Sequence, residues 1–433
     1  MTLLLRKQNV KPEFGEDLEG QNIYVVDRCQ VEEVNVLFSV PTIQNPAGNN
    51  TRIDLTWSLQ DLYRIEGLNL EFEIRNTSAT ESPTFMHAIA SYFADFKLLI
   101  NKVEVVFHKD RAQLICAVAN NLRLYDESRV YHKLQQTRME VGKTLVGENV
   151  PVSSSVFASI DLFLLFPFLR GFIPNVSGIQ RLELEINFAN NTSSLLNGLF
   201  VRSNTTSNAY GSNLEYRSIK IRQQQARHTD ARMYKNVFPV SYLLDKFETK
   251  LYNHDWTVGG QPLNVDLNLA FAKRKKIVGL HIFIQRPAEI TAYNDSDCGK
   301  FYSGNQVIAY RILSKSKEII KHDVIGENRK DRIKYNLDVN KRRWGTELPF
   351  EILTLSTDLG RLYIPETFID LTNIQVAGDD EFAVSGYNNS ERDIEVELVP
   401  AQTVGANSQV YVVAQYQELM NIDPKSGIVR ILS

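Results

Sequence analysis

The chain has 433 residues, of which 43% are hydrophobic and 23% charged, and its formal net charge is −3. This composition is typical of a globular protein and excludes low-complexity and collagen-like classes, and the small net charge gives no general attraction to nucleic acid or acidic membranes. The length favours two or three domains, and 22 Phe with 18 Tyr favour a β-rich core because aromatic side chains fit pleated surfaces.

The amino-terminal end predicts an arm rather than part of a core. Residues 1–20 have mixed charge and little apolar surface. The three leucines before Arg6 and Lys7 are too short a run for a signal sequence, and the apolar run 162–169 is too short to span a bilayer as a helix. We therefore expect no export or membrane-spanning segment.

Alternation of apolar and polar residues with period two recurs along the chain and predicts half-buried antiparallel strands. The segments with this pattern are 34–40, 68–74, 182–188, 263–269 and 394–398. Between Leu214 and Ile221 the alternation slips by one residue, which predicts a β-bulge. A clear helical pattern occurs at Asp110–Tyr125, with Asp110 as its N-cap.

Long polar connections separate the strands, at 45–51, 189–213, 292–305 and 377–392. Such loops are uncommon in compact domains unless they cover or bind something. The polar stretch 223–236 contains no Gly or Pro and separates two β-rich halves of similar length. This organisation predicts two β-domains packed directly together, each with enough short strands for a sandwich or a jelly roll.

Motifs with known chemistry are few. Val141–Thr144 reads VGKT, but the phosphate-binding signature needs a Gly where Thr137 stands.

The three cysteines are Cys29, Cys116 and Cys298. They predict neither a disulfide framework nor a zinc site, which fits a reducing cytoplasm. Glycosylation sequons at Asn76, Asn190 and Asn204 are expected to be chance matches in a chain rich in Asn.

No catalytic, cofactor-binding or metal-binding residue is predicted, and we do not expect an enzyme. The seven histidines show none of the usual metal-site spacings; they are His87, His108, His132, His228, His254, His281 and His322. The pairs Glu183/Glu185 and Glu395/Glu397 each lie on one strand face, whereas glycosidase carboxylates usually come from different strands. We interpret both pairs as parts of solvated strand faces.

Two basic clusters, Lys273–Lys276 and Lys341–Arg343 beside Trp344, could contact phosphates locally. Runs of this kind are more often solvated loops or donors of ion pairs between subunits. No sequence-specific binding of nucleic acid is predicted.

One segment carries a resemblance to a known family. FIPNVSGIQRLELEINFANNTS, residues 172–193, resembles the end of the first jelly roll in the tectivirus major coat protein. Further segments are similar, in the same order, to the wider double jelly-roll capsid family: 159–174, 238–256, 264–285, 305–324 and 408–419. In that family, 305–324 corresponds to a polar loop followed by a helical, basic segment. The Gln/Ala-rich amino-terminal helix of the tectivirus coat is not reproduced here.

The resemblance implies an all-β fold of two consecutive eight-stranded jelly rolls, with a few short flanking helices and long loops. The expected division is an arm at 1–20, a first jelly roll at 21–225, a linker at 226–237 and a second jelly roll with a C-terminal tail at 238–433. It also implies a major capsid protein that forms homotrimers, and these build pseudo-hexagonal capsomers in the icosahedral shell of a tailless virus.

The implied partners are neighbouring capsomers, penton and minor capsid proteins, and no cofactor is implied. The arm, with Arg6, Lys7 and Lys11, would contact an internal viral membrane or a neighbouring subunit. The implied location is the virion, after synthesis and assembly in the host cytoplasm.

Two alternatives stay open. A carbohydrate-binding jelly-roll protein would use exposed Tyr210, Tyr293 and Tyr302, and an enzyme on a β-sandwich would need a bound metal or a converging acid pair.

Overall fold

A computed structural model describes residues 31–39, 51–56, 63–80, 82, 84–85, 92–108, 150–169, 181–188, 201–202, 214–228, 240–256, 261–271, 276–285, 307–314, 317–323, 367–371, 387–388, 394–400, 408–423 and 426–432. Several predicted features lie outside these residues: the arm, the helix Asp110–Tyr125, the VGKT motif, the three cysteines, the cluster Lys341–Arg343 and the three loop tyrosines. Within the described residues, no helix is long and apolar enough to cross a membrane.

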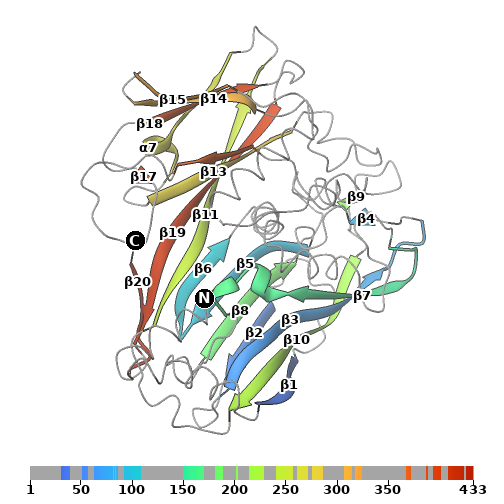
Figure 1. The fold of residues 1–433 in the computed structure, drawn as a ribbon. Coiled ribbons are helices and arrows are strands. Elements are labelled where there is room, and N and C mark those ends of the chain that lie inside the picture. The colour runs from blue at the N-terminus through green and yellow to red at the C-terminus, as the bar shows by residue number, and fades with distance from the viewer. Residues whose placement is uncertain are drawn as a thin grey trace.

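The first half forms two antiparallel sheets (Figure 1). One sheet has the order β1 (Val31–Ser39), β10 (Leu214–His228), β3 (Tyr63–Asn76), β7 (Ser155–Asp161). The other has the order β2 (Thr51–Thr56), β8 (Arg181–Phe188), β5 (Phe93–Ile100), β6 (Val103–His108). Two 3-10 turns, η1 (Leu162–Leu164) and η2 (Pro167–Leu169), follow β7, and the short strands β4 (Thr84–Phe85) and β9 (Val201–Arg202) pair with each other.

The second half repeats this arrangement. Its first sheet has the order β11 (Val240–His254), β19 (Ser408–Ile422), β13 (Lys276–Gln285), β16 (Thr367–Asp370). Its second has the order β12 (Leu263–Asp266), β18 (Ile394–Pro400), β14 (Val307–Ser314), β15 (Lys317–Asp323). In addition, β17 (Tyr387–Asn388) pairs with β13, β20 (Val429–Leu432) pairs with β19, and the single helical turn α7 (Leu267–Ala270) follows β12.

The two halves share one topology. When the eight main strands of each half are numbered in chain order, both halves have the sheet orders 1-8-3-6 and 2-7-4-5. This is the strand order of a jelly roll, in which two sheets of a sandwich are joined by crossing connections. The prediction of two consecutive eight-stranded jelly rolls is confirmed.

Alternating side chains build each sandwich. On β3, Leu68, Leu70, Phe72 and Ile74 are buried, while the residues between them are only partly buried. The Phe72 ring lies 5.0 Å from Phe188 on the opposite sheet. The predicted bulge is confirmed, because the pairing of β10 with β3 shifts register between Arg217 and Lys220.

Two local predictions are wrong. The segment 305–324 contains no helical, basic element in its described part: it forms β14 and β15, since Tyr310 and Ile312 are buried on either side of the partly exposed Arg311. The strand expected at 263–269 ends at Asp266 because the Asp266 carboxylate accepts a hydrogen bond from the Leu269 backbone N–H, at 3.2 Å. This contact turns the chain into α7 and leaves Leu269 83% exposed.

The strand β10 runs to His228, three residues beyond the predicted end of the first jelly roll. The next described strand, β11, begins at Val240. The predicted domain boundaries otherwise stay predictions.

Side chains of the second half complete the core of the first. Eight of them belong to the same buried cluster as the first sandwich: Tyr242, Leu244, Phe283, Tyr411, Val413, Met420, Ile422 and Val429. On β19, Val410, Val412 and Ala414 instead belong to the second core. The strand is therefore apolar on both faces in its first half because it lies between two cores. Figure 1 shows β11 and β19 running together from the second jelly roll along the first.

Candidate functional site

The contact between the jelly rolls is the first candidate region. We call it the seam: β6 and η2 of the first jelly roll against β11, β13 and β19 of the second. Val105 and Val106 are both buried, so β6 is covered on its two faces. The Phe168 ring lies 6.0 Å from the Tyr242 ring across the seam. The second jelly roll therefore covers this edge of the first sandwich, which would otherwise face solvent.

His108 lies in the seam with its ring between aromatic rings from both halves. The Phe96 ring of β5 is 4.8 Å away and the Phe247 ring of β11 is 5.8 Å away. The side chain is 6% exposed. Burial, with the nearby charge of Lys246 as a second cause, lowers the pKa of His108 from 6.5 to about 3. The imidazole is therefore neutral near pH 7.

A network of polar side chains lies next to Phe247. The Phe247 ring lies 6.3 Å from the ring of His281, which is fully buried on β13. The His281 Nε2 atom is 3.2 Å from Gln415 Oε1, and the Gln415 amide donates to Asp245 Oδ1 at 3.0 Å. Gln417 donates to the same oxygen at 3.2 Å. Because unpaired polar groups are costly to bury, this network fixes how β11, β13 and β19 align.

A turn of the first jelly roll holds the carboxyl-terminal hairpin. Asn101 and Lys102, which join β5 to β6, have φ of 48° and 69°, as both central residues of a type I′ turn require. The Asn101 side-chain amide donates to the backbone carbonyl of Gly427 at 2.8 Å, and Gly427 lies in the turn between β19 and β20. The hairpin is therefore anchored to both jelly rolls.

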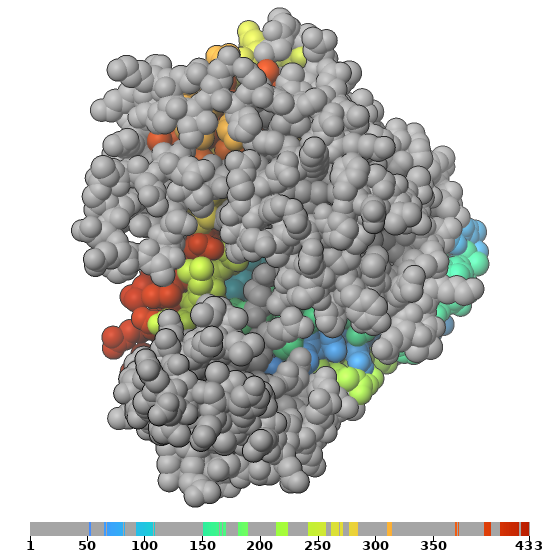
Figure 2. Space-filling model, viewed as in Figure 1, coloured from blue at the N-terminus to red at the C-terminus, as the bar shows by residue number. Residues whose placement is uncertain are grey.

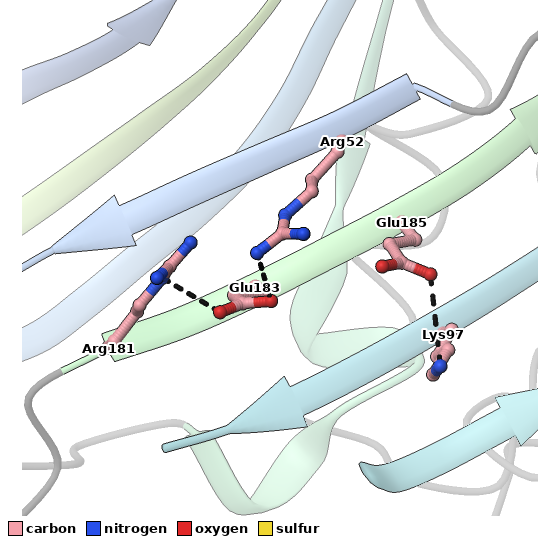
Figure 3. Close-up of polar contacts among 5 residues, drawn as sticks. All are labelled: Arg52, Lys97, Arg181, Glu183 and Glu185. Atoms are coloured by element: carbon pink, nitrogen blue, oxygen red, sulfur yellow. Dashed lines mark hydrogen bonds and ion pairs between the residues drawn. The ribbon is translucent and has the colours of Figure 1, made fainter. Parts of the chain in front are cut away.

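The second candidate region is the face of β8 opposite the first core, which we call the β8 face (Figure 3). The Glu183 carboxylate lies between two guanidinium groups, 2.6 Å from Arg52 Nη2 and 2.8 Å from Arg181 Nε. Glu185 faces Lys97 on β5 at 3.9 Å. The Glu183 side chain is only 4% exposed, so the interpretation of a solvated face is wrong for this residue. Opposite charges from Arg52 on β2 and from Arg181 on β8 itself replace water around it.

The other sheet of the first jelly roll has a similar charged face. The Glu71 carboxylate of β3 lies 2.7 Å from Arg222 Nε and 3.2 Å from Lys220 Nζ, both on β10. Partial burial would raise the pKa of Glu71, but hydrogen bonds and charges from Arg222 and Lys220 together lower it below 4.5. Cross-strand pairs of this kind stabilise the sheet and set its register.

Among the residues that the structure describes, the other sequence-predicted candidates are not brought together into a site. Within the described residues, no group of three His, Cys, Asp or Glu side chains could hold a metal ion. Glu395 and Glu397 lie partly exposed on β18, and Arg311 lies 3.5 Å from Glu397. Asn76 is fully buried, and its amide donates to the carbonyls of Val150 and Pro151, which supports the interpretation of its sequon as a chance match.

The polar network of the seam was not predicted from the sequence. Its residues carry a signal only in context: Gln415 and His281 stand inside otherwise apolar strands, where a polar residue needs a partner. The partner of each comes from another strand, so single-strand patterns do not identify it.

Solved structures with the same architecture come from viruses. The crystal structure of PBCV-1 Vp54 fitted into a reconstruction of the virophage Sputnik matches with a TM-score of 0.58 and 13% identity, over 94% of this chain and 98% of that chain. A chain of the Sputnik virophage structure matches with 0.54 and 12%, over 92% and 88%. The Faustovirus major capsid protein matches with 0.50 and 8%, over 90% of each chain. No protein-family model and no curated protein matches the sequence.

The repeated strand order and these similarities define the class of protein by its fold. The chain has the double jelly-roll fold of viral major capsid proteins, over nearly its whole length. Because the identities are only 8–13%, these similarities show the fold alone and do not establish a function. The narrower expectation of a tectivirus-like bacteriophage coat protein stays a prediction.

Proposed function

We propose that the chain is a major capsid protein without enzymatic activity, which trimerises into pseudo-hexagonal capsomers of an icosahedral shell. The observation that carries the proposal is the repeat of one jelly roll twice in one chain, joined through a shared core. Three such chains around a threefold axis place six similar lobes in a ring. A ring of six near-equivalent lobes tiles a surface hexagonally.

Threefold symmetry needs two different contact surfaces on each subunit, one for each neighbour. Exposed large apolar side chains occur at two separate sheet edges: Phe157 on β7 is 52% exposed, and Ile428 and Leu432 at β20 are 50% and 48% exposed. Figure 1 shows β7 and β20 on opposite sides of the view, and Figure 2 shows C-terminal atoms uncovered at one margin. We propose that these two edges meet in the trimer.

Charge supports the same pairing of edges. Glu73 lies directly opposite Phe157 in the register of β3 and β7. On β20 the exposed Arg430 stands between the two apolar residues. A carboxylate beside the aromatic residue and a cation between the aliphatic residues are complementary.

The further partners proposed are neighbouring capsomers, penton and minor capsid proteins. The arm at residues 1–20 would reach an internal viral membrane or a neighbour, in a virion assembled in the host cytoplasm. Deletion of the arm should leave trimers intact and prevent closed shells. Normal shells from the deleted chain, seen by electron microscopy, would contradict this assignment.

The test of trimerisation is the mass of the purified protein by size-exclusion chromatography with light scattering. We expect a stable species of three times 49.5 kDa at low concentration. Phe157→Arg and Leu432→Arg should each reduce this mass to that of the monomer without loss of strand content, while the control Leu269→Arg, at an exposed residue on α7, should not. A clean wild-type monomer would refute the trimer, and a trimer unaffected by both variants would refute only the proposed edges.

A further inference from the structure

We infer that the seam contains an acid-responsive latch, in which protonation of His108 favours separation of β11 from β6. The inference rests on the fold of a single chain, and it holds whether or not the chain builds a shell.

The position of His108 makes the seam sensitive to its charge. The ring is enclosed by Phe96 of the first jelly roll and Phe247 of the second, and the side chain is 6% exposed. A charged imidazole needs water or a carboxylate, and the closed seam leaves little room for water. Separation of β11 removes Phe247 from the ring and admits water. The charged form therefore prefers the open seam.

The charged groups around the ring oppose protonation in the closed state. From β11, Lys246 places a like charge near the imidazole. The Glu418 carboxylate of β19 lies 2.6 Å from Lys246 Nζ, so this carboxylate is paired with the lysine and not with the imidazole. Asp245 accepts hydrogen bonds from Gln415 and Gln417. Within the described residues, no carboxylate forms an ion pair with His108.

The direction of the effect follows from proton linkage. In the closed seam the pKa of His108 is about 3, and in the open seam the ring returns towards its ordinary 6.5. Between these values the open seam binds more protons, so acid favours it. The equilibrium constant for opening should rise about tenfold for each pH unit in this window, and about 30-fold from pH 7.5 to pH 5.

Hydrogen exchange of the full-length protein, read by mass spectrometry and corrected for intrinsic rates, tests the latch. In the wild type, amide protection in β6 and in the part of β11 around Phe247 should fall about 30-fold from pH 7.5 to pH 5. His108→Phe keeps a ring of similar size that cannot be protonated, and protection there should become independent of pH. The matched control is His254→Phe on β11, the strand that carries Phe247, because His254 is partly exposed and contacts Trp256 and Gln261 instead of the seam.

Three results would overturn the latch. Protection at the seam could be constant with pH in the wild type, or fall equally in His108→Phe. Protection could also fall uniformly in both jelly rolls, which would indicate global unfolding. If His108→Phe does not fold, His108→Gln serves as the second neutral variant. The result is separate from that of the light-scattering test because exchange reports on contacts within one chain, whatever the oligomer.

Discussion

The seam and the charged faces of the first jelly roll both bury polar side chains, but they compensate them differently. On the β8 face, Glu183 lies between two guanidinium groups. In the seam, His108 has aromatic neighbours and the like charge of Lys246, and the buried amides and Asp245 bond to one another. On the β8 face, opposite charges within one sheet hold the strands together. A neutral histidine between two domains makes their contact conditional on pH.

The largest expected effect comes from a charge placed in the seam. Val413 is fully buried on β19 within the core cluster shared by the two jelly rolls. Val413→Asp leaves an unpaired carboxylate there and should destabilise the protein by more than about 4 kcal/mol. Urea denaturation followed by circular dichroism measures this loss. We expect both jelly rolls to unfold in one transition because they share a core.

The control is Val413→Ala, which removes only apolar contacts and should cost about 1–3 kcal/mol. Two separate transitions in either variant, with one jelly roll unaffected, would show that the halves are independent. That outcome would contradict the shared core.

The next effect distinguishes the two sides of one ion-pair group. Arg52→Ala together with Arg181→Ala leaves the buried Glu183 carboxylate without its partners, and should cost about 3–5 kcal/mol. Glu183→Ala should cost less, because Arg52 and Arg181 are 48% and 32% exposed and can turn to water. Urea denaturation midpoints of the three proteins give the order. Equal losses would mean that the carboxylate is hydrated in the folded protein.

The strands were more predictable from the sequence than the contacts between them. Alternation identified β3 and β8 because one face of each strand meets a core and the other meets polar groups. The same rule does not separate burial from exposure on a polar face: Glu183 and Glu185 look alike in the sequence, but only Glu183 lies between two guanidinium groups. The length of β12 depended on one hydrogen bond from Leu269, which periodicity does not record.

The seam was not predictable because it joins residues far apart in the chain. His108 and Phe247 come from different jelly rolls, and each looks like an ordinary strand residue. The run VYVVAQYQ on β19 carried a partial signal. A strand that is apolar on both faces needs two cores, although the sequence does not say that the second is that of the other jelly roll.

The third prediction compares the pH ranges in which the two regions lose stability. The seam contribution of His108 is complete above about pH 6.5, and should fall by about 1.4 kcal/mol per pH unit towards pH 3. Glu71 has a lowered pKa, so its contribution is complete above 4.5 and is lost only as pH falls through the folded value. Urea midpoints between pH 8 and pH 3 separate the two. His108→Phe should remove the loss at pH 5–6, whereas Glu71→Gln should alter only the more acidic part of the curve.

The smallest expected effect is at the turn that anchors the C-terminal hairpin to the first jelly roll. Asn101→Gly keeps the positive φ of 48° but removes the side-chain bonds to Gly427 and to the Arg181 backbone N–H. Loss of these bonds should cost about 1–2 kcal/mol of local stability at the hairpin. The global free energy of unfolding should fall by less. Hydrogen exchange of β20 should accelerate about tenfold or more, while exchange in β3 should not change. The matched control is Lys102→Gly, at the neighbouring position with positive φ, whose side chain is exposed. Since glycine suits both positions, equal exchange of β20 in the two variants would show that turn geometry, and not the Asn101 amide, holds the hairpin to the first jelly roll.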